Sequence, residues 1–205
     1  MINTTKDFYG KQDGEKILYA ITPHNISLYL SIFKTSLASI AVASLGFIIS
    51  SQIPTLPSQI RIYPLIAGLL LLIVGVLNQI VTFNKTISYI TNRRVVRFSA
   101  HTPFATSTRS LTWDQAVKAK SLPPNAIYKM FMIGDITIHS NSTVSAVDNK
   151  STHNTITNDD IEITNVYYYK DLGNYIEKII YTFKNEPDKL NNILPFVAKP
   201  KGKRY

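Results

Sequence analysis

Two long apolar segments dominate the first half of the chain, residues 26–53 and 62–83. The second segment, IYPLIAGLLLLIVGVLNQIVTF, has no charged residue, and as a helix it is long enough to cross a hydrocarbon core of about 30 Å. Pro54 and Pro57 lie in the short link between the segments, which suits a turn between two antiparallel helices. The pattern therefore predicts a transmembrane hairpin of two helices over 26–83.

The first apolar segment is interrupted by a charge. Lys34 lies within it, so we place the first span at about 35–53, with Lys34 at the membrane interface. Residues 25–34 are then expected to lie along the lipid headgroups. Small residues form one face of this span, suited to close packing on the second span or on a partner: Ser36, Ser39, Ala43 and Gly46.

The second half of the chain changes to the pattern of strands. TISYI (86–90) and RVVRF (94–98) are rich in β-branched and aromatic residues. Thr91 and Asn92 lie between them and suit a turn, because Asn tolerates a left-handed conformation. These residues predict a β-hairpin. Further strands are predicted at 106–113, 116–122, 135–140 and 161–166.

The pattern changes again near the end of the chain, where apolar residues recur with the period of an amphipathic helix over about 168–184. These residues are Leu172, Tyr175, Ile176, Ile179, Ile180 and Phe183. Strands followed by one such helix favour a small barrel or sandwich whose open end the helix closes.

The predicted fold class is therefore an α+β membrane protein, in which a two-helix transmembrane hairpin precedes a β domain. The expected parts are a cytoplasmic lead-in (1–25), the hairpin (26–83), the β domain (84–184) with a polar insertion (141–158), and a basic tail (185–205). The insertion holds 11 Ser, Thr or Asn residues out of 18. We interpret it as an extended loop that a partner could order.

Charge predicts how the hairpin is oriented. The chain has a formal net charge of +9. The only basic residue near the link is Arg61, whereas several flank the outer ends of the two spans: Lys6, Lys11 and Lys16 before them, and Lys85, Arg93, Arg94 and Arg97 after them. Positive residues are retained on the cytoplasmic side. We therefore expect a multi-pass protein of the cell membrane with both termini cytoplasmic.

The same charges supply the candidate binding residues. Arg93, Arg94 and Arg97 are possible contacts for anionic lipid headgroups, because a guanidinium forms charge-assisted hydrogen bonds with phosphate. The alternative is that they form a solvated strand face near a membrane.

The sequence offers little for catalysis. It has no cysteine, and the histidines show no metal-ligand spacing: His24, His101, His139 and His153. Asp159, Asp160 and Glu162 could hold a cation or act as acid and base, but a polar rim is the preferred interpretation. We predict no catalytic, cofactor or metal site, and no enzyme activity. A nucleic-acid partner is disfavoured, because an anionic bilayer beside the arginines would repel a polyanion.

Four motifs in order carry a resemblance to a known family: ISYITNRRVVRFSA, RSLTWDQAVKAKSL, YKMFMIGDITIHS and IEITNVYYYKDLGNYIEKI. Together with two preceding spans and the lead-in DGEKILYAITPH, they resemble the bacterial pleckstrin-homology-like (PH-like) family of small membrane-anchored proteins. The resemblance covers about 13–184, and it departs from the family pattern at Ala116 and in the length of the insertion. It implies a PH-like barrel closed by the C-terminal helix, with 91–97 in its first hairpin.

Two functions remain open at this stage. The chain could be a non-catalytic membrane-anchored adaptor whose cytoplasmic domain binds lipid headgroups or a protein. Alternatively, it could be an accessory structural subunit of a larger membrane complex, which the small-residue face of the first span and the polar insertion would suit. Membrane lipids and other membrane proteins are the expected partners.

Overall fold

The computed structural model describes residues 7–53, 57, 59–141 and 159–198. Of the insertion predicted at 141–158, only Asn141 lies within the described residues. The chain divides into two compact units. The helical unit contains Asn25–Lys85 and Ala100–Thr106. The strand unit contains the described residues up to His24, Thr86–Ser99, and the described residues from Ser107 onward.

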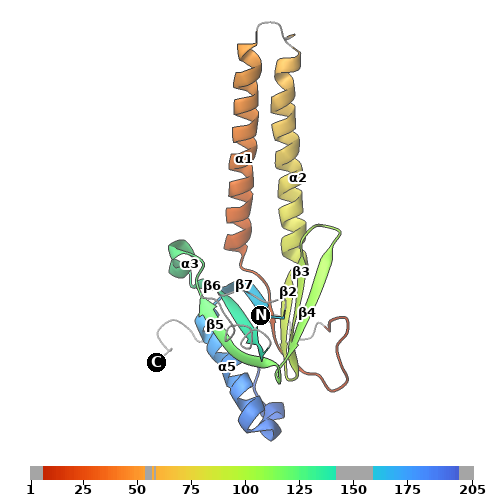
Figure 1. Cartoon of the computed structure of the whole chain (residues 1–205), viewed down its shortest axis with the longest axis vertical. Helices are drawn as coiled ribbons and strands as arrows, with labels where there is room; N and C mark the ends of the chain where they lie inside the picture. Colours follow the sequence, from red (N-terminus) through yellow and green to blue (C-terminus); the bar gives the residue numbers. More distant parts are fainter. Residues whose placement is uncertain (1–6, 54–56, 58, 142–158, 199–205) are drawn as a thin grey trace. The chain divides into compact units, whose positions relative to one another are not determined.

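Two long helices, α1 (Asn25–Gln52) and α2 (Tyr63–Lys85), form the body of the helical unit and run side by side (Figure 1). A short 3-10 turn, η1 (Ile60–Ile62), precedes α2. Both helices are long and apolar enough to cross a membrane, and almost none of either is buried inside the protein. This exposure distinguishes them from the core helices of soluble domains, which bury an apolar face. The second predicted span thus coincides with α2.

The first helix extends beyond the span that we predicted within it, at about 35–53. α1 starts at Asn25, soon after Pro23, and continues without a break through Lys34, which is exposed. The reason is local: lysine is a good helix former, and no glycine or proline lies between Asn25 and Leu45. Residues 25–34 therefore belong to the helix, whose 28 residues span about 42 Å.

Small residues set the contact between α1 and α2. A Cβ atom added to Gly68 would lie 2.5 Å from Ala43 Cβ and 3.1 Å from the Ser39 carbonyl oxygen. One added to Gly46 would lie 2.7 Å from Pro64 Cβ. The helix backbones approach closely because these positions carry little side chain. The small-residue face of α1 is thus used to pack on α2.

The first sheet of the strand unit has four strands in the order β1-β2-β3-β4. They are β1 (Ile17–Ile21), β2 (Ile87–Thr91), β3 (Arg94–Ala100) and β4 (Thr106–Thr112). β1 pairs antiparallel with β2, so that Ile21 lies opposite Ser88 and Ile17 opposite Thr91. This differs from the prediction that residues 1–25 are only a lead-in, because part of that segment is an edge strand of the β domain.

The hairpin of β2 and β3 is confirmed, but its turn differs in detail. Asn92 is not in the left-handed conformation that we expected; among the described non-glycine residues, that region holds Met132, Asn165 and Tyr168. Asn92 instead fixes the turn through hydrogen bonds to the segment before β1: its backbone N–H donates to the Lys16 carbonyl, and its side-chain Oδ1 accepts from the Lys16 N–H.

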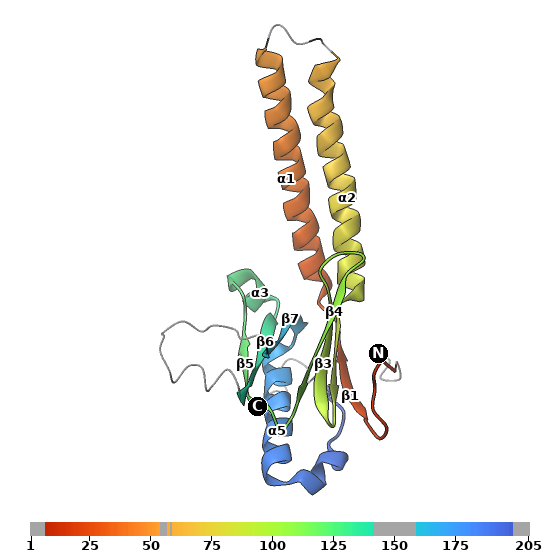
Figure 2. The same cartoon turned by 45° about the vertical axis from the view of Figure 1, so that its right-hand side comes forward.

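The second sheet has three strands, β5 (Ala116–Leu122), β6 (Ile133–Ser140) and β7 (Ile161–Tyr167), all antiparallel. A short helix, α3 (Ala126–Met130), connects β5 to β6. Figure 2 shows the two sheets as separate layers, and the described strands do not close into one barrel. The sandwich alternative of the prediction therefore fits the strand unit better than the barrel.

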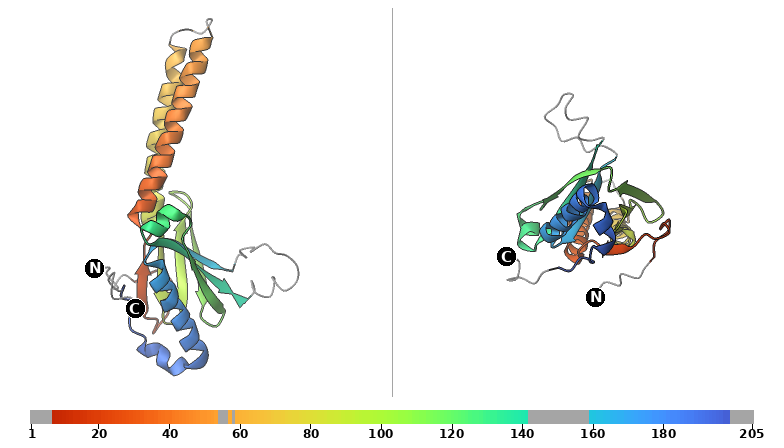
Figure 3. Two further views of the ribbon diagram at one scale, coloured as in Figure 1. Left: turned by 90° about the vertical axis from the view of Figure 1, so that its left-hand side faces the viewer. Right: turned by 90° about the horizontal axis from the view of Figure 1, so that it is seen from below.

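Helix α5 (Tyr169–Asn185) covers the β5-β6-β7 sheet (Figure 3), one residue from the predicted bounds. Its apolar stripe buries Leu172, Ile176 and Ile179 completely, and each such side chain contributes about 1.5–3 kcal/mol by leaving water. The same core includes Trp113 after β4 and Ile90 of the first sheet. Both sheets and α5 thus share one core. A 3-10 segment, η2 (Pro187–Asn192), follows α5.

Candidate functional site

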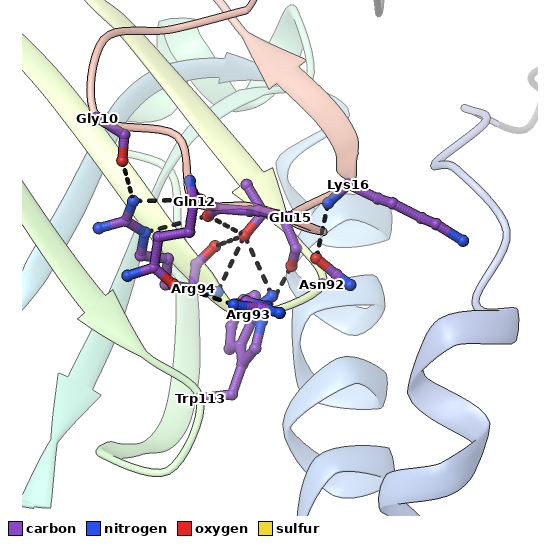
Figure 4. Close-up of polar contacts among 9 residues, drawn as sticks. Gly10, Gln12, Glu15, Lys16, Asn92, Arg93, Arg94 and Trp113 are labelled. Atoms are coloured by element: carbon purple, nitrogen blue, oxygen red, sulfur yellow. Dashed lines mark hydrogen bonds and ion pairs between the residues drawn. The ribbon is translucent and has the colours of Figure 1, made fainter.

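A buried carboxylate joins the segment before β1 to the hairpin of β2 and β3. Glu15 has no exposed side-chain surface. Its carboxylate accepts hydrogen bonds from the Gln12 N–H at 2.8 Å and the Thr91 hydroxyl at 2.8 Å. It also accepts from Arg94, at 3.0 Å from Nε and 3.2 Å from Nη2. Figure 4 shows Gln12 and Arg94 beside Glu15. We call Gln12, Glu15, Thr91 and Arg94 the Glu15 cluster.

The turn between β2 and β3 is also hydrogen-bonded to Trp113, which lies between β4 and β5. Trp113 is fully buried, and its indole Nε1–H donates to the Thr91 carbonyl at 3.0 Å. The Trp113 backbone N–H donates to the Arg93 carbonyl at 3.3 Å. The Arg94 guanidinium in turn donates to the Gly10 carbonyl at 2.5 Å. Residues from three distant parts of the sequence are therefore held at one end of the first sheet.

Electrostatics keeps Glu15 ionised. Burial alone raises the pKa of its carboxyl, but the hydrogen bonds that it accepts and the Arg94 charge outweigh burial, and the pKa is lowered from its ordinary value of 4.5. A carboxylate whose oxygens are already occupied by donors is a poor general base. The Glu15 cluster is thus suited to holding the fold together.

The three predicted headgroup contacts are not brought together. Arg93 is exposed and donates to the Gln12 side-chain oxygen at 3.4 Å. Arg94 forms an ion pair with Glu15. Both lie at the turn, whereas Arg97 lies opposite Ser88, near the other end of the hairpin. Of the three, Arg93 is the one whose guanidinium is exposed for an external anion.

Arg97 lies in a second polar cluster that includes residues of the other sheet. Its Nη2 donates to the Thr164 hydroxyl at 3.5 Å, a long hydrogen bond. Burial lowers the pKa of Arg97, and the negative charges of Glu162 and Asp135 oppose this effect. Burial likewise raises the pKa of Asp135, whose Oδ1 accepts from the Asn165 N–H at 2.7 Å. Arg97 and Asp135 therefore partly compensate each other's burial.

The acidic residues predicted as a polar rim are partly buried. Asp160 is 1% exposed. Its carboxylate accepts from the Ser140 N–H at 2.9 Å and lies 3.0 Å from His139 Nδ1. These contacts join the end of β6 to the start of β7, on either side of the predicted insertion. Asp160 thus has a structural role that the sequence alone did not indicate.

An exposed apolar surface lies at the end of β5 and on α3. Leu122 is 53% exposed, Ile127 56%, Met130 80% and Phe131 44%. Lys118, Lys120 and Lys129 are exposed on the same two elements. We call this set the β5–α3 surface. These exposed apolar residues lie within one short stretch of the chain, residues 122–131, with lysines on the same elements, which makes them a candidate binding face. This surface was not predicted from the sequence, although PPNAIYKMF has apolar residues without a strand or long helix to bury them.

A groove lies between α5 and the C-terminal segment 193–197, with a cavity volume of about 880 Å³. The Tyr175 hydroxyl donates to the Leu194 carbonyl across it at 2.8 Å, and burial raises the pKa of Tyr175 to about 12. The Phe196 ring packs on the rings of Tyr19 and Tyr175. These contacts hold the C-terminal segment against the strand unit.

Within the part of the chain that the structure describes, no group of three or more His, Asp or Glu residues is placed to hold a metal ion. Comparisons of the chain with models of protein families, with curated proteins and with solved structures found no match.

Proposed function

We propose that the chain is a non-catalytic membrane-anchored adaptor, in which a two-helix hairpin holds a PH-like β domain at the cytoplasmic face of the cell membrane. The observation that carries this proposal is the pairing of β1 with β2. β1 precedes the first long helix and β2 follows the second. The domain is therefore built from both chain segments that flank the hairpin, so both ends of the hairpin are covalently joined to the same sheet.

The same pairing supports the proposed orientation. Neighbouring strands of one folded sheet lie on one side of a membrane, so the start of α1 and the end of α2 share that side. The basic residues Lys11, Lys16 and Lys85 lie next to these helix ends in the sequence, whereas Arg61 lies at the other end of the hairpin. The positive-inside rule then favours a cytoplasmic domain.

The buried polar groups favour a binding role over a catalytic one. Glu15 is occupied by Arg94 and by hydroxyl and backbone donors, and Asp160 is occupied by His139 and a backbone donor. The Glu15–Arg94 pair joins the segment before β1 to β3, and the Asp160–His139 pair joins the start of β7 to β6. A group that already has its hydrogen-bond partners within the fold is costly to redirect to a substrate.

The ligand that we propose is a protein with apolar and acidic residues, bound on the β5–α3 surface. Met130 is flexible and polarisable, which suits an adaptable contact. Lys120 and Lys129 complement acidic residues of such a partner. Headgroup binding through the arginines has less support, because Arg94 is paired with Glu15.

The test is amine crosslinking in native membranes, followed by extraction in mild detergent and measurement of particle mass. Lys120 and Lys129 supply amines at the β5–α3 surface. We expect an adduct of fixed mass with the native chain and its loss from Met130→Ser/Phe131→Ser. The control is Leu194→Ser/Val197→Ser, which removes equally exposed apolar side chains, 79% and 80% exposed, from another site. It should keep the adduct.

Other outcomes would reject a protein ligand on the β5–α3 surface. A large particle of fixed stoichiometry without crosslinking would identify an accessory subunit of a complex, the second function left open by the sequence. No adduct with the native chain, together with a particle near the mass of the chain alone, would reject a protein partner. Binding to anionic but not neutral vesicles, reduced by Arg93→Ala, would then support headgroup binding. Arg94→Ala is unsuitable there because it leaves Glu15 unpaired.

A further inference from the structure

The loop that joins β3 to β4 exposes a phenylalanine. Phe104 is 98% exposed. The loop itself is ordered by its own hydrogen bonds: the His101 N–H donates to the Ala105 carbonyl at 3.1 Å, and the Ala105 N–H donates to the Thr102 hydroxyl at 3.0 Å. A Phe side chain that is fully exposed to water forgoes the favourable free energy of apolar burial. A formed loop that presents such a residue therefore points to an apolar environment around it.

The position of this loop indicates which environment that is. Residues Ala100–Thr106 belong to the same compact unit as α1 and α2, and Figures 1 and 2 show the loop beside the end of α2. Lys85, the last residue of α2, donates from Nζ to the Pro103 carbonyl at 2.7 Å. Phe104 is thus held next to the C-terminal end of a helix long and apolar enough to cross a membrane.

We propose that Phe104 is an interfacial anchor, inserted at the boundary between headgroups and acyl chains of the bilayer that α2 crosses. This inference rests on the membrane anchorage in the proposed function. The apolar sequence of α2 ends at Phe83, and Lys85 follows at headgroup depth. Because Lys85 holds the loop, Phe104 lies near that depth. An aromatic ring there is removed from water, while Lys85 remains close to phosphate.

The consequence is a second attachment of the β domain to the membrane. β3 and β4 belong to the first sheet, and their joining loop would add a lipid contact to the covalent links through β1 and β2. A further point of contact with the bilayer reduces the rotational freedom of the domain. The anchor would thus restrict the directions in which the β5–α3 surface can face.

The test is quenching of tryptophan fluorescence by lipids brominated on their acyl chains, in reconstituted vesicles. Trp113 is the only native tryptophan and is fully buried, so the native chain gives the background. Phe104→Trp reports on the loop. Leu70→Trp, at a 57% exposed site in α2, reports on the span. Tyr9→Trp, at a 97% exposed site in the strand unit, is the matched aromatic control.

We expect the added indoles of Leu70→Trp and Phe104→Trp to lose fluorescence and shift to the blue, and that of Tyr9→Trp to remain unquenched. Quenching of Leu70→Trp without quenching of Phe104→Trp would overturn the proposal that Phe104 is an interfacial anchor. The loop would then contact water or a protein instead of lipid. Equal quenching of Phe104→Trp and Tyr9→Trp would also overturn it, because the contact would not be specific. An unquenched Leu70→Trp would instead refute the membrane anchorage of the proposed function.

Discussion

Replacement of Glu15 by glutamine is expected to destabilise the strand unit without changing its shape. The substitution keeps the volume of the side chain but removes the charge that pairs with Arg94. It also turns an amide N–H₂ toward groups that are themselves donors, namely Arg94, the Thr91 hydroxyl and the Gln12 N–H. The half-buried guanidinium then lacks its counter-charge, and the single amide oxygen of the new side chain can accept from only part of this set of donors.

The magnitude follows from the burial of the pair. Removal of one partner from a fully buried ion pair costs about 3–5 kcal/mol. The Glu15 side chain is 0% exposed but that of Arg94 is 15% exposed, so water can solvate part of the guanidinium, and we expect a loss of about 2–4 kcal/mol. Trp113 provides the assay, because its indole donates to Thr91 within the same turn. Urea unfolding in detergent, followed by Trp113 emission, measures the free energy of unfolding.

The pH dependence gives an independent check. The pKa of Glu15 is lowered in the folded chain, so ionised Glu15 contributes stability that is present above its unfolded pKa and is lost as pH falls through the folded pKa. The difference in the free energy of unfolding between the native chain and Glu15→Gln should be largest at neutral pH. It should shrink in acid, as the pH falls below about 4.5. Glu177→Gln, at an exposed site on α5, is the matched control and should change little. A loss below about 1 kcal/mol at neutral pH, or one that grows in acid, would refute the reasoning.

Two further predictions use the absence of cysteine from the chain. For topology, an impermeant maleimide should label Gln59→Cys in intact cells but Tyr9→Cys only after permeabilisation; the reverse pattern would place the β domain outside. For the helix contact, Gly75→Cys with Thr35→Cys should crosslink on oxidation, because a Cβ at Gly75 would lie 4.0 Å from Thr35 Cβ, a separation that suits a disulfide. Gly75→Cys with Ile40→Cys, where Ile40 is 60% exposed, should not; equal crosslinking of both pairs would contradict the packing.

Elements with a strong local pattern were predictable from the sequence. Residues 168–184 repeat apolar side chains with the helical period, and α5 follows within one residue. The hairpin of β2 and β3 was recognised because β-branched and aromatic residues flank a short polar turn. The second span was recognised from length and hydropathy alone. In each case the information lies within about 20 neighbouring residues.

The parts that were missed depend on contacts between distant residues. Glu15 and Arg94 are 79 positions apart, so local charge could not show that this arginine has a buried partner. β1 is only five residues long, and its partner strand lies beyond the entire helical hairpin. Asp160 looked like part of a charged loop because the sequence does not show that His139 and the Ser140 N–H meet it. For this reason the sequence favoured solvent or lipid, and not a buried partner, as the environment of Arg94 and Asp160.

The long separation between β1 and β2 also constrains how the proposed protein can insert. β1 cannot pair until the chain has passed through α1 and α2 and returned, because its partner begins at Ile87. A chain with only one helix inserted would place β1 and β2 on opposite sides of the membrane. The Glu15 cluster could not form there, since Glu15 and Arg94 would be separated by the bilayer. The sheet therefore forms only when both helices cross or neither does, and for the proposed membrane-anchored protein the cost of exposing α1 and α2 to water favours insertion of both.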